Sequence, residues 1–496
     1  MRILFVVRHH LYLRNYESTL KALAARNHAV YIASNIHDSR YINIIKTFEN
    51  IPNIHFLPEC APIRSDVWSI FARFFRALQD YIHYFSPLFD DAPRLKQRAC
   101  MWLPQWLANA LYRLRNSSMV DQLKKVLRFC EKILPRCKAI DAFLITNSPD
   151  VLLITPYVDL KSQQVDYVKS ARALGIPSVY CVASWDNLTS KAAIKVQPDK
   201  MFVWNTFQEN EAIKLHNMPQ SKIVVTGAQC YDQWFHWKPV DTQEKFYSKV
   251  GLKHDTPYIL YLCSSIFIAR NEVDFVRRWI NALRRCGDSN IKNIGILIRP
   301  HPQNAEQWKK IKVTEWDNVA LFPKEGEQPI TSGLKEDYFN SMYFSSAVVG
   351  INTSAMIEAG ILGKPVFTIQ TNDFMETQEG TVHFRYLSNG GLLYSSTSIA
   401  EHVDQLSHVL LENQDYKTRI QQFIADFIRP RGLGYDCTPF VVDEIEAVYR
   451  ENKTMENPRW RALYSCVRIA CFPFAVVLLF VFAMKRLNKR DIQHII

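Results

Sequence analysis

The sequence predicts an α/β protein made of two doubly wound domains that face a cleft. Short apolar runs alternate with helical segments from the N-terminus, beginning with the strand Ile3–Val7, the helix Glu17–Arg26 and the strand 29–33. The same alternation restarts at Pro257. A chain of 496 residues is also too long for one compact core. We therefore expect two Rossmann-like domains.

The domain boundaries follow from where this alternation stops and restarts. We expect an N-terminal domain over residues 1–235, an interdomain link over 236–257, a second domain over 258–450 and a tail over 451–496. Pro239 and Pro257 mark the link. Residues 61–138 break the alternation, and we expect a helical insert there.

The insert is aromatic and basic. Helices are expected over 67–78 and 100–115, which mix aromatic residues with arginines. Helices of this composition either lie in a membrane interface or pack on a sheet with their arginines directed to solvent. Both interpretations stay open for this region.

The remaining elements form βα units. In the first domain we expect a strand at 142–147, a helix at 167–174 and strands at 175–183, 200–204 and 222–227. In the second we expect strands at 257–263 and 294–299 and helices at 272–285, 337–344, 404–411 and 417–428. Domains of this kind bind ligands at the carboxyl ends of their strands.

The stretch Gly350–Ile369 organises the second domain. Two strands and the helix between them are expected over 347–351, 365–369 and 355–362. The triplet Asn352-Thr353-Ser354 is expected to cap the helix, where hydroxyls and free N–H groups form an anion site. Glu358 lies one turn beyond Ser354, where it can bind a sugar hydroxyl. The alternative is an ordinary, well-capped strand–helix–strand unit.

Further phosphate-binding candidates stand at other strand ends of the second domain. Arg299 and His301 lie in an Arg-Pro-His-Pro sequence. Arginine offers phosphate a bidentate fork, and histidine can donate a proton to a departing phosphate. The alternative for His301 is a buried histidine in a turn. Additional donor-binding candidates are Ser264, Ser265, Gln378 and His383; the loop that holds the last two can instead be a solvated turn.

Acceptor-side candidates stand at strand ends of the first domain. Asp186 follows a predicted strand and is a candidate general base for an acceptor hydroxyl, unless it only closes an Asx-type turn. Trp185 can stack on a sugar face. The other acceptor-binding candidates are Asn187, His9, His10 and Arg14.

Composition limits the partners and cofactors. The net charge of +12 indicates an anionic partner such as a nucleotide, a phosphate-rich acceptor or a membrane surface. Nucleic-acid-binding motifs are absent, as are a GxGxxG dinucleotide sequence and a convincing DxD metal pair, so we expect no cofactor and no metal. The 11 cysteines contain no CxxC pair, which favours a reduced cytoplasmic setting over a disulfide framework.

The C-terminal tail is hydrophobic and basic. Residues 469–484 carry no charge, and basic residues flank them on both sides. Because a spanning helix needs about 20 apolar residues, this segment is expected to be a membrane anchor, spanning or shallow. A helix docked on the enzyme body is the alternative.

The unit Asn-Thr-Ser-Ala-Met-Ile-Glu-Ala with Gly-Lys-Pro-Val, together with Arg-Pro-His-Pro, resembles the GT-B glycosyltransferases. The nearest groups are the CDP-glycerol glycerophosphotransferase-like and capsule-polysaccharide transferase proteins, and the unit is also similar to one in UDP-N-acetylglucosamine 2-epimerases. The resemblance implies that Thr353 and Ser354 hold the donor diphosphate or phosphate and that Glu358 holds its ribose. It also implies that His301 matches a histidine that serves the donor phosphate or the leaving group. Ala359 replaces the epimerases' second glutamate, which speaks against epimerase chemistry.

The expected function is transfer of a sugar or glycerol-phosphate unit from a nucleotide-activated donor to a lipid-linked or polymeric surface polysaccharide. Asp186 and His301 are the expected catalytic residues, and the enzyme is expected on the cytoplasmic side of the membrane. The alternatives are a nucleotide-sugar epimerase or hydrolase, and a non-catalytic membrane scaffold of a polysaccharide assembly complex.

Overall fold

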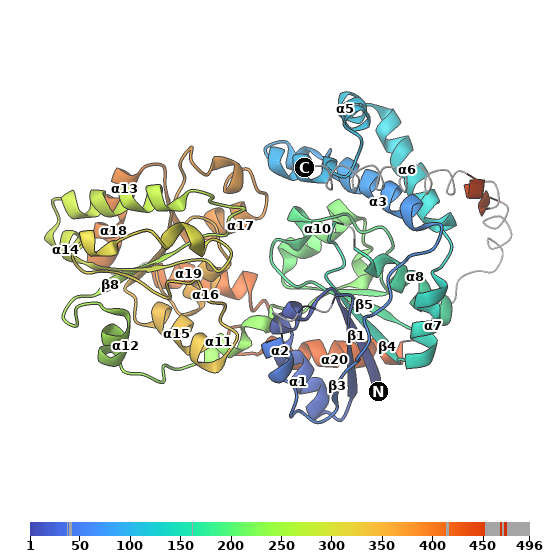
Figure 1. Cartoon of the computed structure of the whole chain (residues 1–496), viewed down its shortest axis with the longest axis horizontal. Helices are drawn as coiled ribbons and strands as arrows, with labels where there is room; N and C mark the ends of the chain where they lie inside the picture. Colours follow the sequence, from blue (N-terminus) through green and yellow to red (C-terminus); the bar gives the residue numbers. More distant parts are fainter. Residues whose placement is uncertain are drawn as a thin grey trace, which may run out of the picture. The chain divides into compact units, whose positions relative to one another are not determined.

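The chain forms two compact units in the computed structural model, which describes residues 1–36, 38, 42–160, 162–412, 416–451, 467, 468 and 471–473. The first unit contains Met1–Gln229 and the described residues from Thr438 onwards, and the second contains Cys230–Cys437. Each unit has one parallel sheet with helices on both faces (Figure 1). The predicted α/β class with two doubly wound sheets is confirmed.

The sheet of the first unit has seven strands in the order β3-β2-β1-β4-β5-β6-β7. Their bounds are β1 Arg2–Val7, β2 Ala29–Ser34, β3 Ile54–Phe56, β4 Val151–Thr155, β5 Ser178–Cys181, β6 Lys200–Val203 and β7 Ile223–Val225. The central strands are almost fully buried and mainly apolar, because helices cover both faces of the sheet. The strand order reverses between β1 and β4, so the loops after these two strands diverge there.

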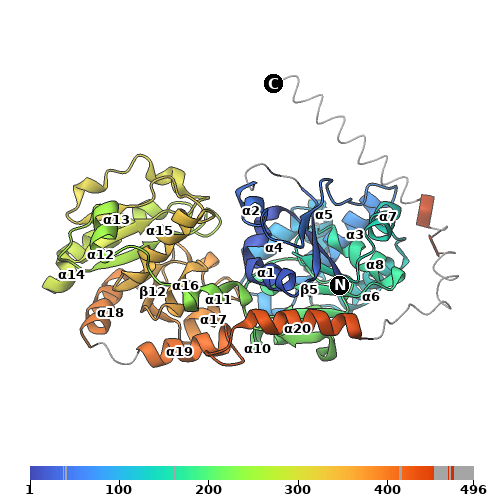
Figure 2. The same cartoon turned by 90° about the horizontal axis from the view of Figure 1, so that it is seen from below.

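The helices of this unit include the helical insert and the last described helix. Their bounds are η1 His10–Asn15, α1 Glu17–Ala25, α2 Ile42–Lys46, α3 Ser69–His83, α4 Pro93–Cys100, α5 Gln105–Arg113, α6 Ser118–Ile133, α7 Lys138–Asn147, α8 Gln164–Leu174, α9 Asn187–Ser190, α10 Thr206–His216 and α20 Cys437–Arg450. Helix α20 lies along this unit (Figure 2), where Arg26 pairs with Asp443 at 2.6 Å and His28 with Glu446 at 2.8 Å.

The strand expected at 142–147 is wrong. These residues belong to helix α7, and the strand that pairs with β1 is β4. The apolar run Ala142–Thr146 is compatible with a buried strand and with a helix, because a short apolar run shows no clear periodicity. Ile140 and Leu144 are buried at helical spacing, while Ile145 is 59% exposed. The helix ends at Ser148, whose positive φ of 39° turns the chain into the strand.

The insert is helical, as predicted, but the helix expected over 100–115 is shorter. It corresponds to α5, which begins only at Gln105 because Pro104 has no N–H to continue a helix and instead precedes the first turn. Helix α4 before it ends at Cys100. Helices α3 and α6 pack against each other, and aromatic residues such as Phe71 and Tyr81 are buried between the helices.

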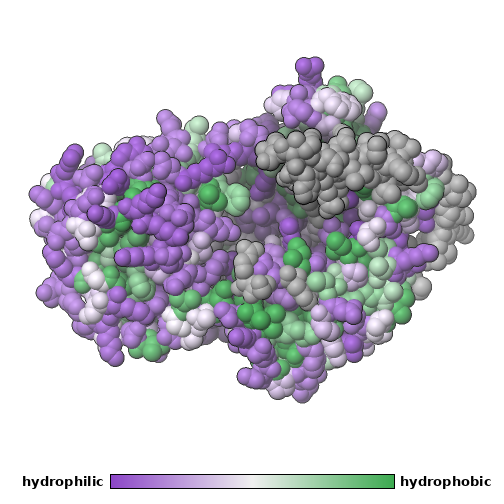
Figure 3. Space-filling view, viewed as in Figure 1, coloured by the Kyte–Doolittle hydropathy of each residue, from purple (hydrophilic) through white to green (hydrophobic). Residues whose placement is uncertain are grey.

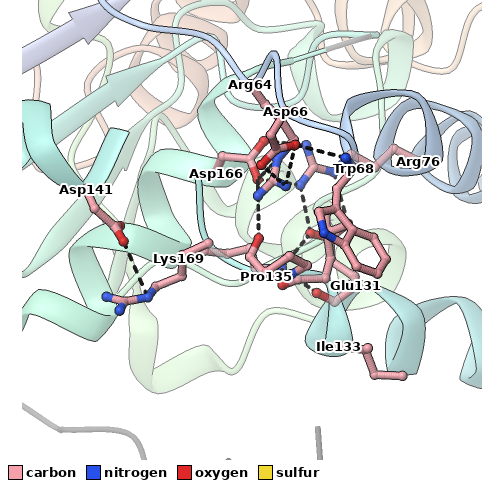
Figure 4. A network of polar contacts seen from close by, with 12 residues as sticks. Arg64, Asp66, Trp68, Arg76, Glu131, Ile133, Pro135, Asp141, Asp166 and Lys169 are labelled. Atoms are coloured by element: carbon pink, nitrogen blue, oxygen red, sulfur yellow. Dashed lines mark hydrogen bonds and ion pairs between the residues drawn. The ribbon is translucent and has the colours of Figure 1, made fainter. Parts of the chain in front are cut away.

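A buried network of charges fastens the insert to the sheet domain (Figure 4). The guanidinium of Arg76 on α3 donates to Glu131 on α6 at 2.8 and 2.9 Å and to Asp166 on α8 at 2.8 and 3.0 Å. Arg64 also donates to Asp166, and Lys169 donates to Glu131. Although burial opposes ionisation, the facing cations hold the pKa values of Asp166 and Glu131 below their ordinary range.

The sheet of the second unit has six strands in the order β10-β9-β8-β11-β12-β13. Their bounds are β8 Tyr258–Leu262, β9 Gly295–Arg299, β10 Val319–Leu321, β11 Ala347–Gly350, β12 Val366–Ile369 and β13 Leu393–Ser396. The order reverses between β8 and β11. The strands expected at 257–263, 294–299, 347–351 and 365–369 are therefore confirmed within one residue at most ends.

Helices cover both faces of this sheet. Their bounds are α11 Asp232–His236, α12 Gln243–Val250, α13 Glu272–Arg285, α14 Ser289–Asn293, α15 Ser332–Tyr343, α16 Ala355–Ile361, α17 Phe384–Asn389, α18 Ile399–Glu412 and α19 Tyr416–Phe427. Helix α12 lies within the stretch 236–257 that the sequence predicts to link the domains. It packs on this unit, with Phe246 buried against Tyr258 and Phe344.

Most of the predicted anchor segment 469–484 lies outside the described residues. The described residues next to it contact the insert, because Arg468 donates to the carbonyl of Ile133 at 2.6 Å and the Phe472 ring lies 6.1 Å from that of Trp68. Among the described helices, none combines the length and the apolar character that crossing a bilayer requires.

We expect Arg76→Ala to destabilise the protein by about 3–5 kcal/mol, because the substitution leaves two buried carboxylates without their main cation. The shift of the denaturant midpoint measures this loss. Lys124→Ala is the matched control, since it removes a cation of the same insert whose pairing with Asp121 is exposed. Equal midpoints for the two variants would contradict the assigned role of the network.

Candidate functional site

Two candidate residues meet where the strand order of the second sheet reverses. Ser264 follows β8 and Asn352 follows β11, and the backbone N–H of Asn352 donates to the Ser264 hydroxyl at 3.4 Å. Both side chains are buried. This is the position at which doubly wound sheets bind ligands.

The loops at this edge are tied together by buried amides and hydroxyls. Asn304, after β9, donates to the carbonyls of Ser264 at 3.1 Å and Ala269 at 2.8 Å. Asn352 donates to the carbonyl of Thr377 at 2.6 Å, and Thr377 donates to that of Ile268 at 2.9 Å. The loops after four neighbouring strands thus form one hydrogen-bonded frame.

A buried carboxyl supports this frame from behind. Glu272, the first residue of α13, accepts from the Ser264 N–H at 2.8 Å and from the Tyr261 hydroxyl at 3.3 Å. Its side chain is fully buried, and burial raises its pKa to about 8. The group is therefore largely protonated at neutral pH. The sequence shows only the first acidic residue of a helix here, which is an ordinary feature.

Arg299 is the most unusual charged group of the site. It ends β9, is 5% exposed, and donates through Nη1 to the Ser341 hydroxyl at 3.1 Å. No carboxylate among the described residues lies within ion-pair distance of it. Burial lowers its pKa to about 10. A desolvated guanidinium at a strand end is a strong binding group for a phosphate.

Tyr338 joins Arg299 to Glu358. The Arg299 guanidinium lies 4.9 Å from the centre of the Tyr338 ring, and the Tyr338 hydroxyl donates to the Glu358 carboxylate. The structure therefore brings together a predicted cation and a predicted carboxylate through a residue that the sequence analysis missed. The sequence does contain one sign of this contact. Tyr338 and Ser341 are polar residues three positions apart on the expected helix 337–344, so they lie on the same face of it.

His301 is half-buried in the turn after β9. Its Nδ1 accepts from the N–H of Gln303 at 3.1 Å, which assigns the proton of the neutral ring to Nε2. Gly326, with a φ of +62°, packs against this turn, and a Cβ there would meet the Ala305 Cβ at 2.6 Å and the His301 carbonyl at 3.1 Å. The turn that presents His301 thus depends on a glycine in a separate loop.

The helix expected after the triplet is confirmed as α16, and within the triplet the capping contact comes from Thr353 and not from Ser354. The Ser354 backbone is already helical and its side chain makes no capping hydrogen bond. Thr353 accepts weakly from the N–H of Ala355 at 3.4 Å. Ser354 is exposed and Thr353 half-exposed, while Asn352 is committed to the loop frame.

The other donor-binding candidates are less accessible. Gln378 is fully buried and donates to Ile351, Thr368 and Ile369 at 3.0 to 3.2 Å, so its amide N–H groups bind the protein itself. His383 is buried at the start of α17. The Ser265 carbonyl accepts from the next turn of the loop after β8.

The acceptor-side candidates of the first unit lie on two connected loops. Asn15, at the end of η1, donates to the carbonyl of Ala183 at 2.9 Å and so joins the loop after β1 to the loop after β5. His9 is half-buried, and burial together with neighbouring Arg8 lowers its pKa to about 4. His10 is buried against Phe56, and Arg14 is exposed.

Asp186 is held by its own loop. Its Oδ2 accepts from the Ser190 hydroxyl at 2.6 Å and its Oδ1 from the Asn187 amide at 3.4 Å. Trp185 and Asn187 are buried, and Asn187 also accepts from the N–H of Ala183. The carboxylate itself is half-exposed, so it combines a fixed orientation with access to solvent.

The insert braces the loop that bears Asp186. Arg98 on α4 donates to the Ser190 carbonyl, and Tyr84 after α3 donates to the Lys191 carbonyl. Asp80 on α3 accepts from the N–H of Ala193 at 2.9 Å and pairs with Lys195. A cavity of about 630 Å³ lies beside α3, bordered by Arg73, Phe74, Trp102 and Lys195 among others. None of the predicted acceptor residues borders it.

No protein-family model and no curated protein matches the chain. Solved structures do match. UDP-GlcNAc 2-epimerase from Neisseria meningitidis, bound to UDP-GlcNAc, is 14% identical with a TM-score of 0.52, over 90% of this chain and 100% of that one. UDP-GlcNAc 2-epimerase from Methanocaldococcus jannaschii is 12% identical with a TM-score of 0.53 over the same shares. A glycosyltransferase from Rickettsia africae is 10% identical with a TM-score of 0.51, over 91% of this chain and 99% of that one. The chain therefore has the GT-B-like fold shared by nucleotide-sugar epimerases and glycosyltransferases.

We expect Glu272→Gln to flatten the pH dependence of stability. Because the folded-state pKa of Glu272 is raised from 4.5 to about 8, the unfolded chain loses this proton first, and the native protein loses stability as pH rises from about 5 to 8. Denaturant midpoints measured across this range test it. Glu325→Gln, at an exposed position, is the control. Parallel pH profiles for wild type and E272Q would show that the carboxyl is ionised in the native protein.

Proposed function

We propose that the protein is a transferase that moves a sugar or glycerol-phosphate unit from a nucleotide-activated donor to a lipid-linked or polymeric surface polysaccharide. The proposal rests above all on Arg299. A guanidinium that is 5% exposed and has no carboxylate partner among the described residues is costly to keep in the apo protein. A phosphate oxygen would supply the missing negative charge.

The neighbours of Arg299 fit a nucleotide donor. Glu358 accepts from Tyr338, which stacks beside the guanidinium, so a carboxylate for a ribose hydroxyl stands next to a cation for the phosphates. His301 carries a proton on Nε2 when neutral. The resemblance to GT-B enzymes assigns the same positions to donor phosphate and ribose. The Neisseria meningitidis structure of this fold contains UDP-GlcNAc.

The proposed reaction is a displacement at the transferred group. The acceptor hydroxyl attacks the donor, its proton passes to Asp186, and the bond to the nucleotide's phosphate oxygen breaks. Arg299, Thr353 and Ser354 would stabilise the charge on the departing nucleotide, and His301 would donate a hydrogen bond or a proton to it. Ser190 and Asn187 would fix the orientation of Asp186, because both donate to its carboxylate.

A nucleotide-sugar epimerase or hydrolase is the second candidate, favoured by the epimerases among the solved structures of this fold. Ala359, in place of the second glutamate of those enzymes, favours transfer. Incubation with the donor alone separates the two, since an epimerase or hydrolase turns over without an acceptor. We further propose that the enzyme acts at the cytoplasmic side of a membrane, where a lipid-linked acceptor would be available.

We expect Arg299→Ala to weaken nucleotide binding by about 10- to 100-fold, the value of a charge-assisted hydrogen-bond pair. Calorimetry with UDP and CDP measures the affinity, and a thermal melt without nucleotide checks the fold. Arg278→Ala is the control, since Arg278 is exposed and pairs with Asp373 in the same unit. If wild type binds neither nucleotide, the non-catalytic scaffold becomes the better interpretation.

We expect Asp186→Asn to reduce transfer by about 10²- to 10⁴-fold while nucleotide affinity stays unchanged. The amide keeps a hydrogen-bonding oxygen for Ser190 but cannot take the acceptor proton. Product release under single-turnover conditions is the measurement. Wild-type transfer rates in D186N would rule out Asp186 as the base.

A further inference from the structure

The outward faces of helices α5 and α6 carry large apolar side chains among their polar ones. Each helix already buries one apolar stripe in the insert, through Ala108 and Leu111 on α5 and Val120 and Leu127 on α6. An amphipathic helix of a globular protein normally has a polar face opposite such a stripe. These two helices depart from that rule.

The exposed apolar side chains are large. Met101 is 70% exposed, Trp106 72%, Met119 60% and Val126 52%. Met119 and Val126 lie two turns apart on one face of α6. Met101 directly follows α4, and Trp106 is the second residue of α5. The projection at the top of Figure 3, which α5 forms in Figure 1, shows hydrophobic and hydrophilic residues side by side. Several large apolar side chains exposed along one short stretch of chain are typical of an interaction surface.

The same two helices are positively charged. Residues 105–133, which contain both, have six Lys and Arg but only two Asp and Glu, a net charge of +4. One of the two acids, Glu131, is buried and paired with Arg76 and Lys169. The surface that meets a partner is therefore strongly cationic as well as apolar.

We propose that this face of α5 and α6 seats on the surface of a membrane leaflet that contains anionic lipids. Tryptophan and methionine would enter the interface between headgroups and acyl chains, and Arg113, Arg115, Lys125 and Arg128 would contact the phosphates. Charge is the reason for choosing an anionic leaflet, because the two helices and the turn between them carry six lysines and arginines against one exposed acid, Asp121.

Two described residues of the expected anchor segment 469–484 contact the insert. Cys471 packs against the apolar cluster that contains Trp68 and Phe71, and the Phe472 ring lies 6.1 Å from that of Trp68. The insert therefore carries the exposed apolar residues of α5 and α6 and also contacts the start of the hydrophobic segment 469–484. Membrane binding generally needs two separate signals to be stable.

Vesicle co-sedimentation of the full-length protein tests the proposal without nucleotide or acceptor, so its outcome is independent of the transfer reaction. The vesicles are phosphatidylcholine alone or mixed with phosphatidylglycerol. Binding to the anionic vesicles should fall at least about tenfold in a variant with R113Q, R115Q, K125Q and R128Q, and also in the W106S/M119S variant. Wild-type binding should weaken as salt rises.

The matched control is V240S/Y435S, which removes two side chains that are each 72% exposed but lie in the second unit. It should bind vesicles like the wild type, and all variants should share the wild-type melting temperature. Unchanged vesicle binding in both insert variants would overturn the proposal and leave the tail as the membrane contact. Light scattering that shows a wild-type dimer converted to a monomer by W106S/M119S, with vesicle binding retained, would equally overturn it and assign the face to self-association.

Discussion

The buried pairing of Arg76 with Asp166 and Glu131 is the constraint on which the first unit depends. The carboxylates of Asp166 and Glu131 accept most of the hydrogens of this buried guanidinium, and this pairing holds α3 in one orientation against α6 and α8. That orientation brings Asp80 and Tyr84 to the loop that bears Asp186. The helical insert thus determines the shape of the candidate acceptor site.

The second unit is held together at its binding edge mainly by hydrogen bonds between neutral groups. Its loops are joined by neutral amides and hydroxyls, and the carboxyl of Glu272, whose pKa is raised by burial, lies behind them. Arg299, the buried cation at this edge, has no anionic partner among the described residues. A rigid neutral frame around a desolvated charge is pre-organised for an anionic ligand. The binding energy would come from a charge that the protein already holds in place.

Periodicity predicts most strands of both sheets but misses β3, β4, β10 and β13, and the predicted helix Glu272–Arg285 matches α13 to the residue. The prediction fails at 142–147 because a short apolar run fits strand and helix alike, and only the burial of Ile140 and Leu144 decides. Arg299 can be recognised from the sequence because its neighbours in the chain, Pro300 and His301, already indicate a phosphate site. Tyr338 cannot, because its role comes from its contacts with Arg299 and Glu358, which are 39 positions before it and 20 after it. Gln378 is misleading, since a polar residue near a binding edge can equally hold the backbone together.

Helix α20 has a practical consequence for dissecting the molecule. It belongs to the first unit although the whole second unit precedes it in sequence, and it contributes Asp443 and Glu446 to ion pairs with Arg26 and His28. The second unit is therefore an insertion between two segments of the first. A fragment ending near residue 229 would lack a structural helix, whereas residues 230–437 are contiguous in sequence and suit separate expression.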